Sequence, residues 1–209
     1  MSAATAQLNV ARWLPRSRVN GPGERFVLWV QGCPLHCPGC WNPDTWSFAP
    51  RKVVSVAELL EHVLAVRPID GVTFTGGEPF AQAGPLADLA ESLRGHDLSL
   101  MAFTGYELHE LTHPDQQRLL AQLDIVVTGR FVRELQADGL LWRGSSNQRV
   151  HYLTPRHARR EVEVGGEPTA ELIIDRSGRV SVVGFPIQEL LVELGLPSRI
   201  ATRHGERSV

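Results

Sequence analysis

Phe26–Cys40, with the sequence FVLWVQGCPLHCPGC, joins a continuously apolar run to a tight group of cysteines. A short apolar run without alternation is typical of a parallel strand that is buried on both faces. The cysteines therefore follow the carboxyl end of a strand, which is where α/β sheets and barrels place their functional loops.

Cys33, Cys37 and Cys40 are all the cysteines of the chain, and their spacing is CxxxCxxC. A structural zinc site or a four-cysteine iron–sulfur cluster needs one more protein ligand. Three thiolates instead leave one position of a metal centre open to a small molecule. The odd number of cysteines also disfavours a disulfide framework and favours a reducing, cytoplasmic location.

The cysteines alone leave other interpretations open. A zinc site completed by His36 or by a more distant histidine is one, and simple burial of the three thiols is another. Pro34, Pro38 and Gly39 favour a loop that wraps around a bulky group, because proline fixes φ and glycine leaves it unrestricted.

A second motif, Thr75–Pro79 (TGGEP), follows the apolar run Gly71–Phe74. Two glycines permit a close approach of the backbone to a ligand, and the Glu78 carboxylate offers acceptors to an ammonium group. By itself such a segment is an ordinary turn at the end of a strand.

Helices are predicted where apolar periodicity follows a start signal, and strands where apolar runs are short. The predicted helices are Ser55–Val66, Pro85–Leu93 and Pro114–Leu123, and the strands besides Phe26–Val30 are Val72–Thr75, Leu98–Phe103 and Ile125–Val127. This alternation predicts an α/β fold. Because 209 residues are too few for a complete barrel of about 250, we expect a partial, open (βα) barrel.

The character of the chain changes after Pro155. A basic stretch at 156–160 is followed by the alternating segment Glu161–Val164, by two runs on either side of a turn, Ala170–Asp175 and Arg179–Val183, and by an amphipathic segment, Ile187–Leu194. We therefore predict a core of residues 1–155 and an extension of residues 156–209, a β-hairpin and a helix packed on the core, where covering a sheet edge is the simplest role.

Composition excludes several classes of protein. The net charge of −2 shows no basic excess of the kind that nucleic-acid binding needs. No apolar run is long enough for a membrane helix, and no signal peptide is recognisable. We expect a cytoplasmic protein.

The two motifs together resemble the radical S-adenosylmethionine (SAM) superfamily. Four further segments resemble the glycyl-radical-enzyme activases within it, most closely those of anaerobic ribonucleoside-triphosphate reductase: Asn20–Phe26, Cys40–Trp46, Phe103–Tyr106 and Leu141–Gln148, of which the last (LWRGSSNQ) is the most discriminating. The resemblance covers about Leu8 to Pro155 and also implies a partial (βα) barrel.

This resemblance implies a chemistry. Cys33, Cys37 and Cys40 would bind a [4Fe–4S] cluster whose fourth iron binds SAM. Reductive cleavage of SAM would give a 5′-deoxyadenosyl radical, which generates a glycyl radical on a partner, the anaerobic ribonucleoside-triphosphate reductase. A flavodoxin-type protein would supply the electron.

The resemblance also implies roles for single residues, each with a plain structural alternative. Residues expected to bind SAM are Gly76, Gly77 and Glu78 at its amino group, Gly39 and Trp41 around it, and Thr104, Thr128 and Arg130 at its carboxylate and ribose. A second set is expected either to line the opening for the partner's peptide or to form a hydrogen-bonded turn: Arg143, Ser145, Ser146 and Asn147.

Thr128 departs from the activases, which usually carry aspartate before the glycine of this turn. Two alternatives stay open, and this departure would suit the first of them. One is a radical SAM tailoring enzyme that acts on a peptide or a small metabolite, and the other is a non-catalytic iron–sulfur or zinc protein.

Overall fold

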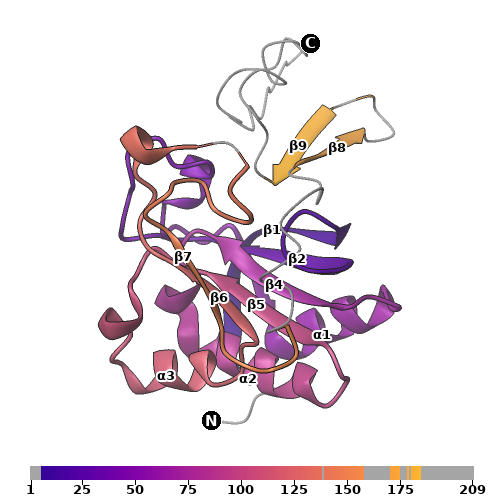
Figure 1. Ribbon diagram of the computed structural model, residues 1–209. Helices are drawn as coiled ribbons and strands as arrows, with labels where there is room; N and C mark the ends of the chain where they lie inside the picture. Colours follow the sequence, from indigo (N-terminus) through magenta and orange to yellow (C-terminus); the bar gives the residue numbers. More distant parts are fainter. Residues whose placement is uncertain (1–5, 138, 158–169, 175–177, 179, 185–209) are drawn as a thin grey trace.

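A seven-stranded mixed sheet dominates the computed structural model, which describes residues 6–137, 139–157, 170–174, 178 and 180–184 (Figure 1). Its strands, in the order β3-β1-β2-β4-β5-β6-β7, are β1 (Gln7–Ser17), β2 (Arg25–Val30), β3 (Lys52–Ser55), β4 (Gly71–Gly76), β5 (Ser99–Phe103), β6 (Ile125–Thr128) and β7 (Arg149–Tyr152). Pairing is parallel from β2 to β6 and antiparallel at both sides of that centre.

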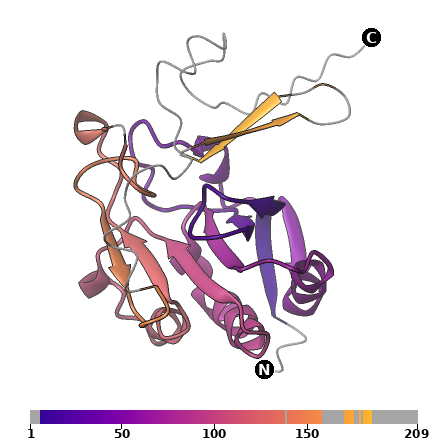
Figure 2. The ribbon, with the colours of Figure 1, turned by 45° about the vertical axis from the view of Figure 1, so that its right-hand side comes forward.

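In the described part of the chain, three α-helices connect the strands, namely α1 (Val56–Ala65), α2 (Ala83–Arg94) and α3 (Pro114–Leu120), and they lie along one face of the sheet (Figure 2). The loops also contain short 3-10 helices, among them η2 (Pro43–Thr45), η3 (Pro79–Gln82), η4 (Leu108–Glu110) and η5 (Arg133–Leu135). Ser55 begins α1 as predicted, because its hydroxyl accepts the N–H of Glu58 at 3.2 Å.

The two faces of the sheet are covered differently. Alternate residues of β5 and β6 pack against the helices, and the others, such as Met101 and Val127, pack under Trp142. Trp142 is 6% exposed and belongs to the loop between β6 and β7. The loop at 129–148 therefore takes the place of a helix on this face.

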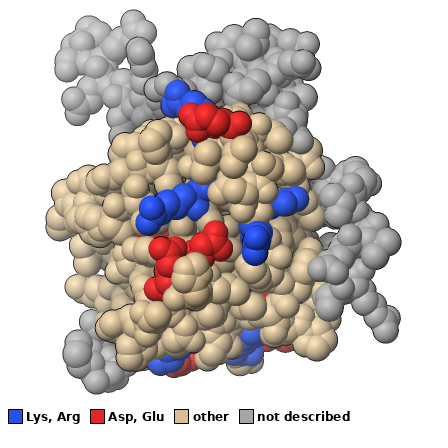
Figure 3. All heavy atoms as spheres, turned by 60° about the vertical axis from the view of Figure 1, so that its left-hand side comes forward, with Lys and Arg blue, Asp and Glu red and all other residues tan. Residues whose placement is uncertain are grey.

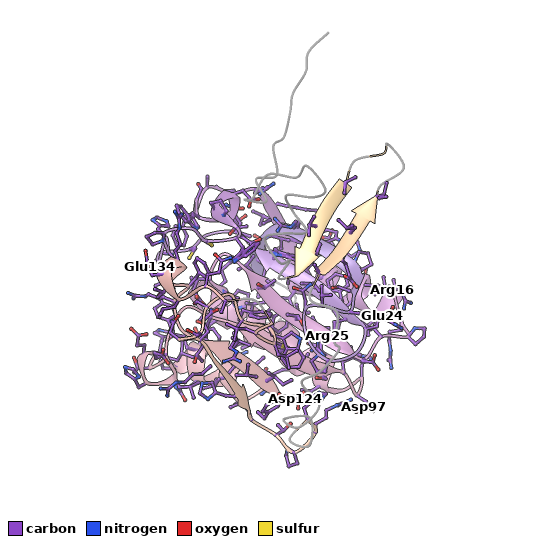
Figure 4. All side chains as sticks on the ribbon, turned by 45° about the horizontal axis from the view of Figure 1, so that its top comes forward. Arg16, Glu24, Arg25, Asp97, Asp124 and Glu134 are labelled. Atoms are coloured by element: carbon purple, nitrogen blue, oxygen red, sulfur yellow. The ribbon has the colours of Figure 1, made fainter. Side chains whose placement is uncertain are left out.

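Arg25 in β2 is fully buried, which the sequence did not indicate. Its guanidinium donates to the hydroxyl of Thr73 at 2.7 Å and to the carbonyls of Val72 and Ser99, each at 2.8 Å. Burial lowers its pKa to about 9. Figure 4 shows it inside the molecule, where it ties three neighbouring strands together at their amino ends.

The predicted α/β class and all four central strands are confirmed, with shifts at their ends. The helix predicted from Pro85 begins earlier, at Ala83, directly after η3, and the helix predicted to reach Leu123 ends at Leu120. The antiparallel strands β1, β3 and β7 were not predicted.

The predicted hairpin is present as β8 (Ala170–Ile174) and β9 (Val180–Gly184), a separate two-stranded sheet. The backbone N–H of Arg18 donates to the Glu171 carboxylate at 2.7 Å and links β8 to the chain after β1. The predicted segments at 161–164 and 187–194 lie outside the described residues. Within the described part, no helix has the length and hydropathy of a membrane span.

Candidate iron–sulfur and SAM site

The cysteine loop leaves β2 at the carboxyl edge of the sheet. Cys33 is 8% exposed, Cys37 and Cys40 are half-buried, and all three are free thiols. Positive φ angles at His36 (46°) and Gly39 (84°) turn the backbone tightly. The chain that follows closes the loop, since the N–H of Cys33 donates to the Trp46 carbonyl at 3.0 Å.

Two opposing effects act on the thiols. Burial raises the pKa of Cys33 and of Cys40. Nearby N–H groups oppose this effect, from Leu35 and His36 at Cys33 and from Asn42 at Cys40, whose sulfur lies 3.4 Å from that nitrogen. N–H groups directed at sulfur favour the thiolate, which is the form that binds metal.

In the part of the chain that the structure describes, the three thiols do not form a group that could hold a single metal ion. Among the described residues, no group of three His, Cys, Asp or Glu side chains can hold one metal ion, so the geometry gives no support to a zinc site completed by His36. In a cubane each thiolate binds a different iron, so the thiols need not converge on one point. The indole N–H of Trp46 is buried without a hydrogen-bond partner of good geometry, yet it lies near enough to Cys40 to lower its pKa. A thiolate ligand would give this N–H an acceptor.

The GGE segment lies directly against the cysteine loop. The N–H groups of Gly77 and Glu78 donate to the carbonyls of Val30 and Gly32, both at 2.9 Å. A Cβ at Gly77 would lie 2.3 Å from the Gly32 carbonyl oxygen, and Gly76 has a φ of 102°. Glycine is thus required for this contact between two backbones.

Glu78 is 1% exposed and binds groups of the protein itself. Its Oε1 accepts the N–H of Phe80 and the hydroxyl of Thr104, and its Oε2 accepts the N–H of Gly105, all at 2.9 Å. Burial raises its pKa to about 7, although all three hydrogen bonds act in the opposite direction. Glu78, the predicted acceptor for an ammonium group, therefore has one carboxylate oxygen, Oε2, that accepts a single hydrogen bond and has the capacity to accept another.

The turn after β5 completes this cluster of loops. A Cβ at Gly105 would lie 2.4 Å from the Leu35 side chain, so the turn packs on the cysteine loop. The cysteine loop, the GGE segment and Thr104-Gly105 are therefore in mutual contact, as expected for loops that follow neighbouring parallel strands.

Thr128 at the end of β6 is fully buried, and its hydrogen-bond partners are different from those of Glu78. Its hydroxyl lies 2.9 Å from Nε2 of His151 and 3.5 Å from the Glu107 carboxylate. Burial lowers the pKa of His151. Arg130 is exposed, and its Cγ lies 3.8 Å from where a Cβ of Gly105 would be. The sequence did not indicate His151 or Glu107, which come from other strands or loops.

The segment Leu141–Gln148 forms a hydrogen-bonded turn, one of its two predicted roles. Gln148, which was not singled out, accepts the N–H groups of Gly144 and Ser145 and donates to the Gly129 carbonyl at 2.9 Å. Asn147 donates to the Arg130 carbonyl at 2.8 Å. Of the other predicted residues, Ser145 is buried, Ser146 is exposed and Arg143 is half-buried.

Trp41 lies beside this turn, since its Nε1 is 3.2 Å from where a Cβ of Gly144 would be. Figure 3 looks onto the side of the molecule that carries η4 and η5, where basic and acidic side chains lie close together. The face therefore has no large patch of one sign.

Glu78 gives a testable pH dependence. Its folded-state pKa of about 7 lies above its ordinary value of 4.5, so its stabilising contribution is complete below pH 4.5 and is lost as the pH rises through 7. We expect the free energy of unfolding of the apoprotein to fall by about 3 kcal/mol over this range relative to a Glu78→Gln variant. Urea unfolding at a series of pH values measures the difference. Glu61→Gln on α1, where the glutamate is exposed, is the control, and parallel profiles for wild type and Glu78→Gln would refute the prediction.

Comparisons with known proteins agree with this site. A family described as "4Fe-4S single cluster domain" matches residues 19–151. The chain is 34% identical over 158 residues to the anaerobic ribonucleoside-triphosphate reductase-activating protein of Vibrio cholerae. The aligned region covers 70% of this chain and 99% of the relative. It is 33% identical over 154 residues to the protein of that name from Escherichia coli K12, with the same coverage. The protein of that name from enterobacteria phage T4 is 33% identical over 150 residues, 68% of this chain and 93% of the relative.

Proposed function

The chain belongs to the 4Fe-4S single cluster domain family and to the anaerobic ribonucleoside-triphosphate reductase-activating proteins, and on this basis we propose that it is a radical SAM enzyme that generates a glycyl radical on a partner reductase. The observation that carries the proposal is the contact of three loops at one sheet edge: the three-thiol loop, the GGE segment and the turn at Thr104-Gly105.

Cys33, Cys37 and Cys40 would hold the [4Fe–4S] cluster, and SAM would take the remaining iron. When bound, the cluster supplies one electron to the SAM sulfonium, which yields methionine and the 5′-deoxyadenosyl radical. Burial raises the pKa of Cys33 and Cys40, N–H groups directed at the two sulfurs oppose this effect, and Cys33 is largely shielded from water.

The SAM amino group would bind beside Gly76 and Gly77, where the lack of side chains lets the backbone approach, and at Oε2 of Glu78. Glu78 also holds the turn after β5 in place through Thr104. Arg130, whose stem lies beside Gly105, is suited to the SAM carboxylate, and Gly39 and Trp41 would lie around the ligand. Thr104 and Thr128 would lie at the SAM carboxylate and ribose, and the Thr128 hydroxyl would be oriented by Nε2 of His151 at 2.9 Å.

The fold would be a partial, open (βα) barrel of the radical SAM type. Four parallel strands, helices on one face and a loop with Trp142 on the other support this proposal. Residues 1–155 would form the catalytic core and 156–209 an extension packed on it. In support, the family match ends at residue 151, and β8 pairs with β9 and with no strand of the main sheet.

The partner would be an anaerobic ribonucleoside-triphosphate reductase, and a flavodoxin-type protein would be the electron donor. The test is anaerobic reconstitution with iron, sulfide and SAM, followed by reduction and electron paramagnetic resonance (EPR) with and without the candidate reductase. We expect a doublet from a glycyl radical only when both proteins are present. SAM cleavage without that doublet would contradict the proposed acceptor and point to a peptide or metabolite substrate.

A further inference from the structure

A guanidinium group rests on the cysteine loop at Gly39. A Cβ at Gly39 would lie 2.7 Å from Nε, 2.9 Å from Nη2 and 3.2 Å from Cζ of Arg133. These three atoms all belong to the planar group, so the cation itself, rather than the aliphatic stem, contacts the loop. Gly39 lies between the predicted iron ligands Cys37 and Cys40.

The backbone around Arg133 is held by the segment Leu141–Gln148. The hydroxyl of Ser145 accepts the N–H of Val132 at 3.2 Å, and the N–H of Ser146 donates to the Leu135 carbonyl at 2.8 Å. Ser145 also forms a β-bridge with Gln136 and is fully buried. These contacts hold η5, and with it Arg133, beside the cysteine loop.

The charge of Arg133 is not compensated within the described part of the chain, where its side chain makes no hydrogen bond and no ion pair. Arg12 and Arg51 also lie near the loop, but each pairs with Asp44 at 3.3 Å. The neighbouring acid, Glu134, makes no ion pair with Arg133 among these residues. Arg133, which is exposed, therefore adds an unbalanced positive charge beside the loop segment that carries Cys37 and Cys40.

We propose that Arg133 raises the reduction potential of the cluster and so eases its uptake of an electron. This inference rests on the proposed function. Transfer of one electron from a flavodoxin-type donor makes a [4Fe–4S] centre more negative by one unit, and it forms and breaks no bond. A nearby cation stabilises the more negative state, and net charge around a cluster is one of the factors that set its potential. Arg133 touches no reacting atom, so it is a positioning residue that acts through charge.

The test is a potentiometric titration of the reconstituted protein, with the reduced cluster followed by EPR. Arg133→Gln should lower the ratio of reduced to oxidised cluster about threefold at a fixed solution potential, a shift of about 28 mV at 59 mV per tenfold change. Arg133→Lys keeps the charge and should stay close to wild type. Arg67→Gln is the matched control and should leave the potential unchanged.

Arg67 is far from the cysteine loop. Arg16 donates to the carbonyls on both sides of it, those of Val66 and Pro68, and Figure 4 shows Arg16 on the opposite side of the molecule from Glu134.

An unchanged potential in Arg133→Gln, equal shifts in the glutamine and lysine variants, or equal shifts in Arg133→Gln and Arg67→Gln would each overturn the inference. The iron and sulfide content of each reconstituted protein is measured before the titration. If the wild type takes up no cluster, the proposed function fails as well, whereas a normal cluster with an insensitive potential contradicts this inference alone.

Discussion

Replacing Cys37 with alanine should abolish both the iron–sulfur cluster and the cleavage of SAM. Cys37 lies between the other two thiols of the chain, on a loop with two positive φ angles, and no other cysteine can replace it. In the proposed cluster, the iron that this thiolate would hold would be left without a protein ligand. Iron and sulfide per chain and the yield of 5′-deoxyadenosine measure the two effects. A variant that still cleaves SAM would refute the ligand assignment.

His36→Asn is the matched variant for this experiment. His36 is exposed, stacks near Trp46 with ring centroids 5.0 Å apart and has a φ of 46°, which asparagine tolerates well. We expect this variant to keep its cluster and its cleavage of SAM. Loss of metal here, equal to the loss in Cys37→Ala, would favour a zinc site that uses the imidazole.

Replacing Gly77 with alanine should destabilise the protein by about 2–3 kcal/mol and strongly reduce cluster assembly. The new Cβ would meet the carbonyl oxygen of Gly32 at 2.3 Å and its carbon at 2.8 Å. Both are backbone atoms that join β2 to the cysteine loop, so no side chain can move aside. The hydrogen bond from the Glu78 N–H to Gly32 would also be displaced. Urea unfolding of the apoprotein and iron content after reconstitution measure the change.

Gly95→Ala is its control. Gly95 follows α2 with a helical φ of −65°, and the nearest atom to its Cβ would be the Ser92 carbonyl oxygen at 3.6 Å. Alanine should be neutral or stabilise the protein by up to about 1 kcal/mol. If Gly77→Ala were as stable as Gly95→Ala, the inferred tight contact between the GGE segment and the cysteine loop would be refuted.

The sequence predicted the central strands because each is a short apolar run with a distinct loop after it. It did not predict β1, because irregular register between Val10 and Arg12 and again between Leu14 and Ser17 breaks the alternation that marks a strand. The edge strands β3 and β7 contain only four residues each, which is too short for a clear pattern.

The candidate site was predictable to the level of its loops. Parallel strands end at one edge, so the segments after β2, β4, β5 and β6 had to lie near one another. Single contacts were not predictable, because they join residues distant in the chain. The hydrogen bonds from Thr104 to Glu78 and between Thr128 and His151, and the contact of Arg133 with Gly39, depend on how the loops pack. The roles of these residues toward SAM stay predictions.

The most direct test of a three-thiolate cluster that binds SAM is electron–nuclear double resonance on the reduced, reconstituted protein with SAM isotopically labelled at its amino nitrogen. The account predicts a hyperfine coupling between that nitrogen and the electron spin of the cluster. A cluster that forms but shows no coupling, or a single tetrahedral ion held by four side chains, would contradict it.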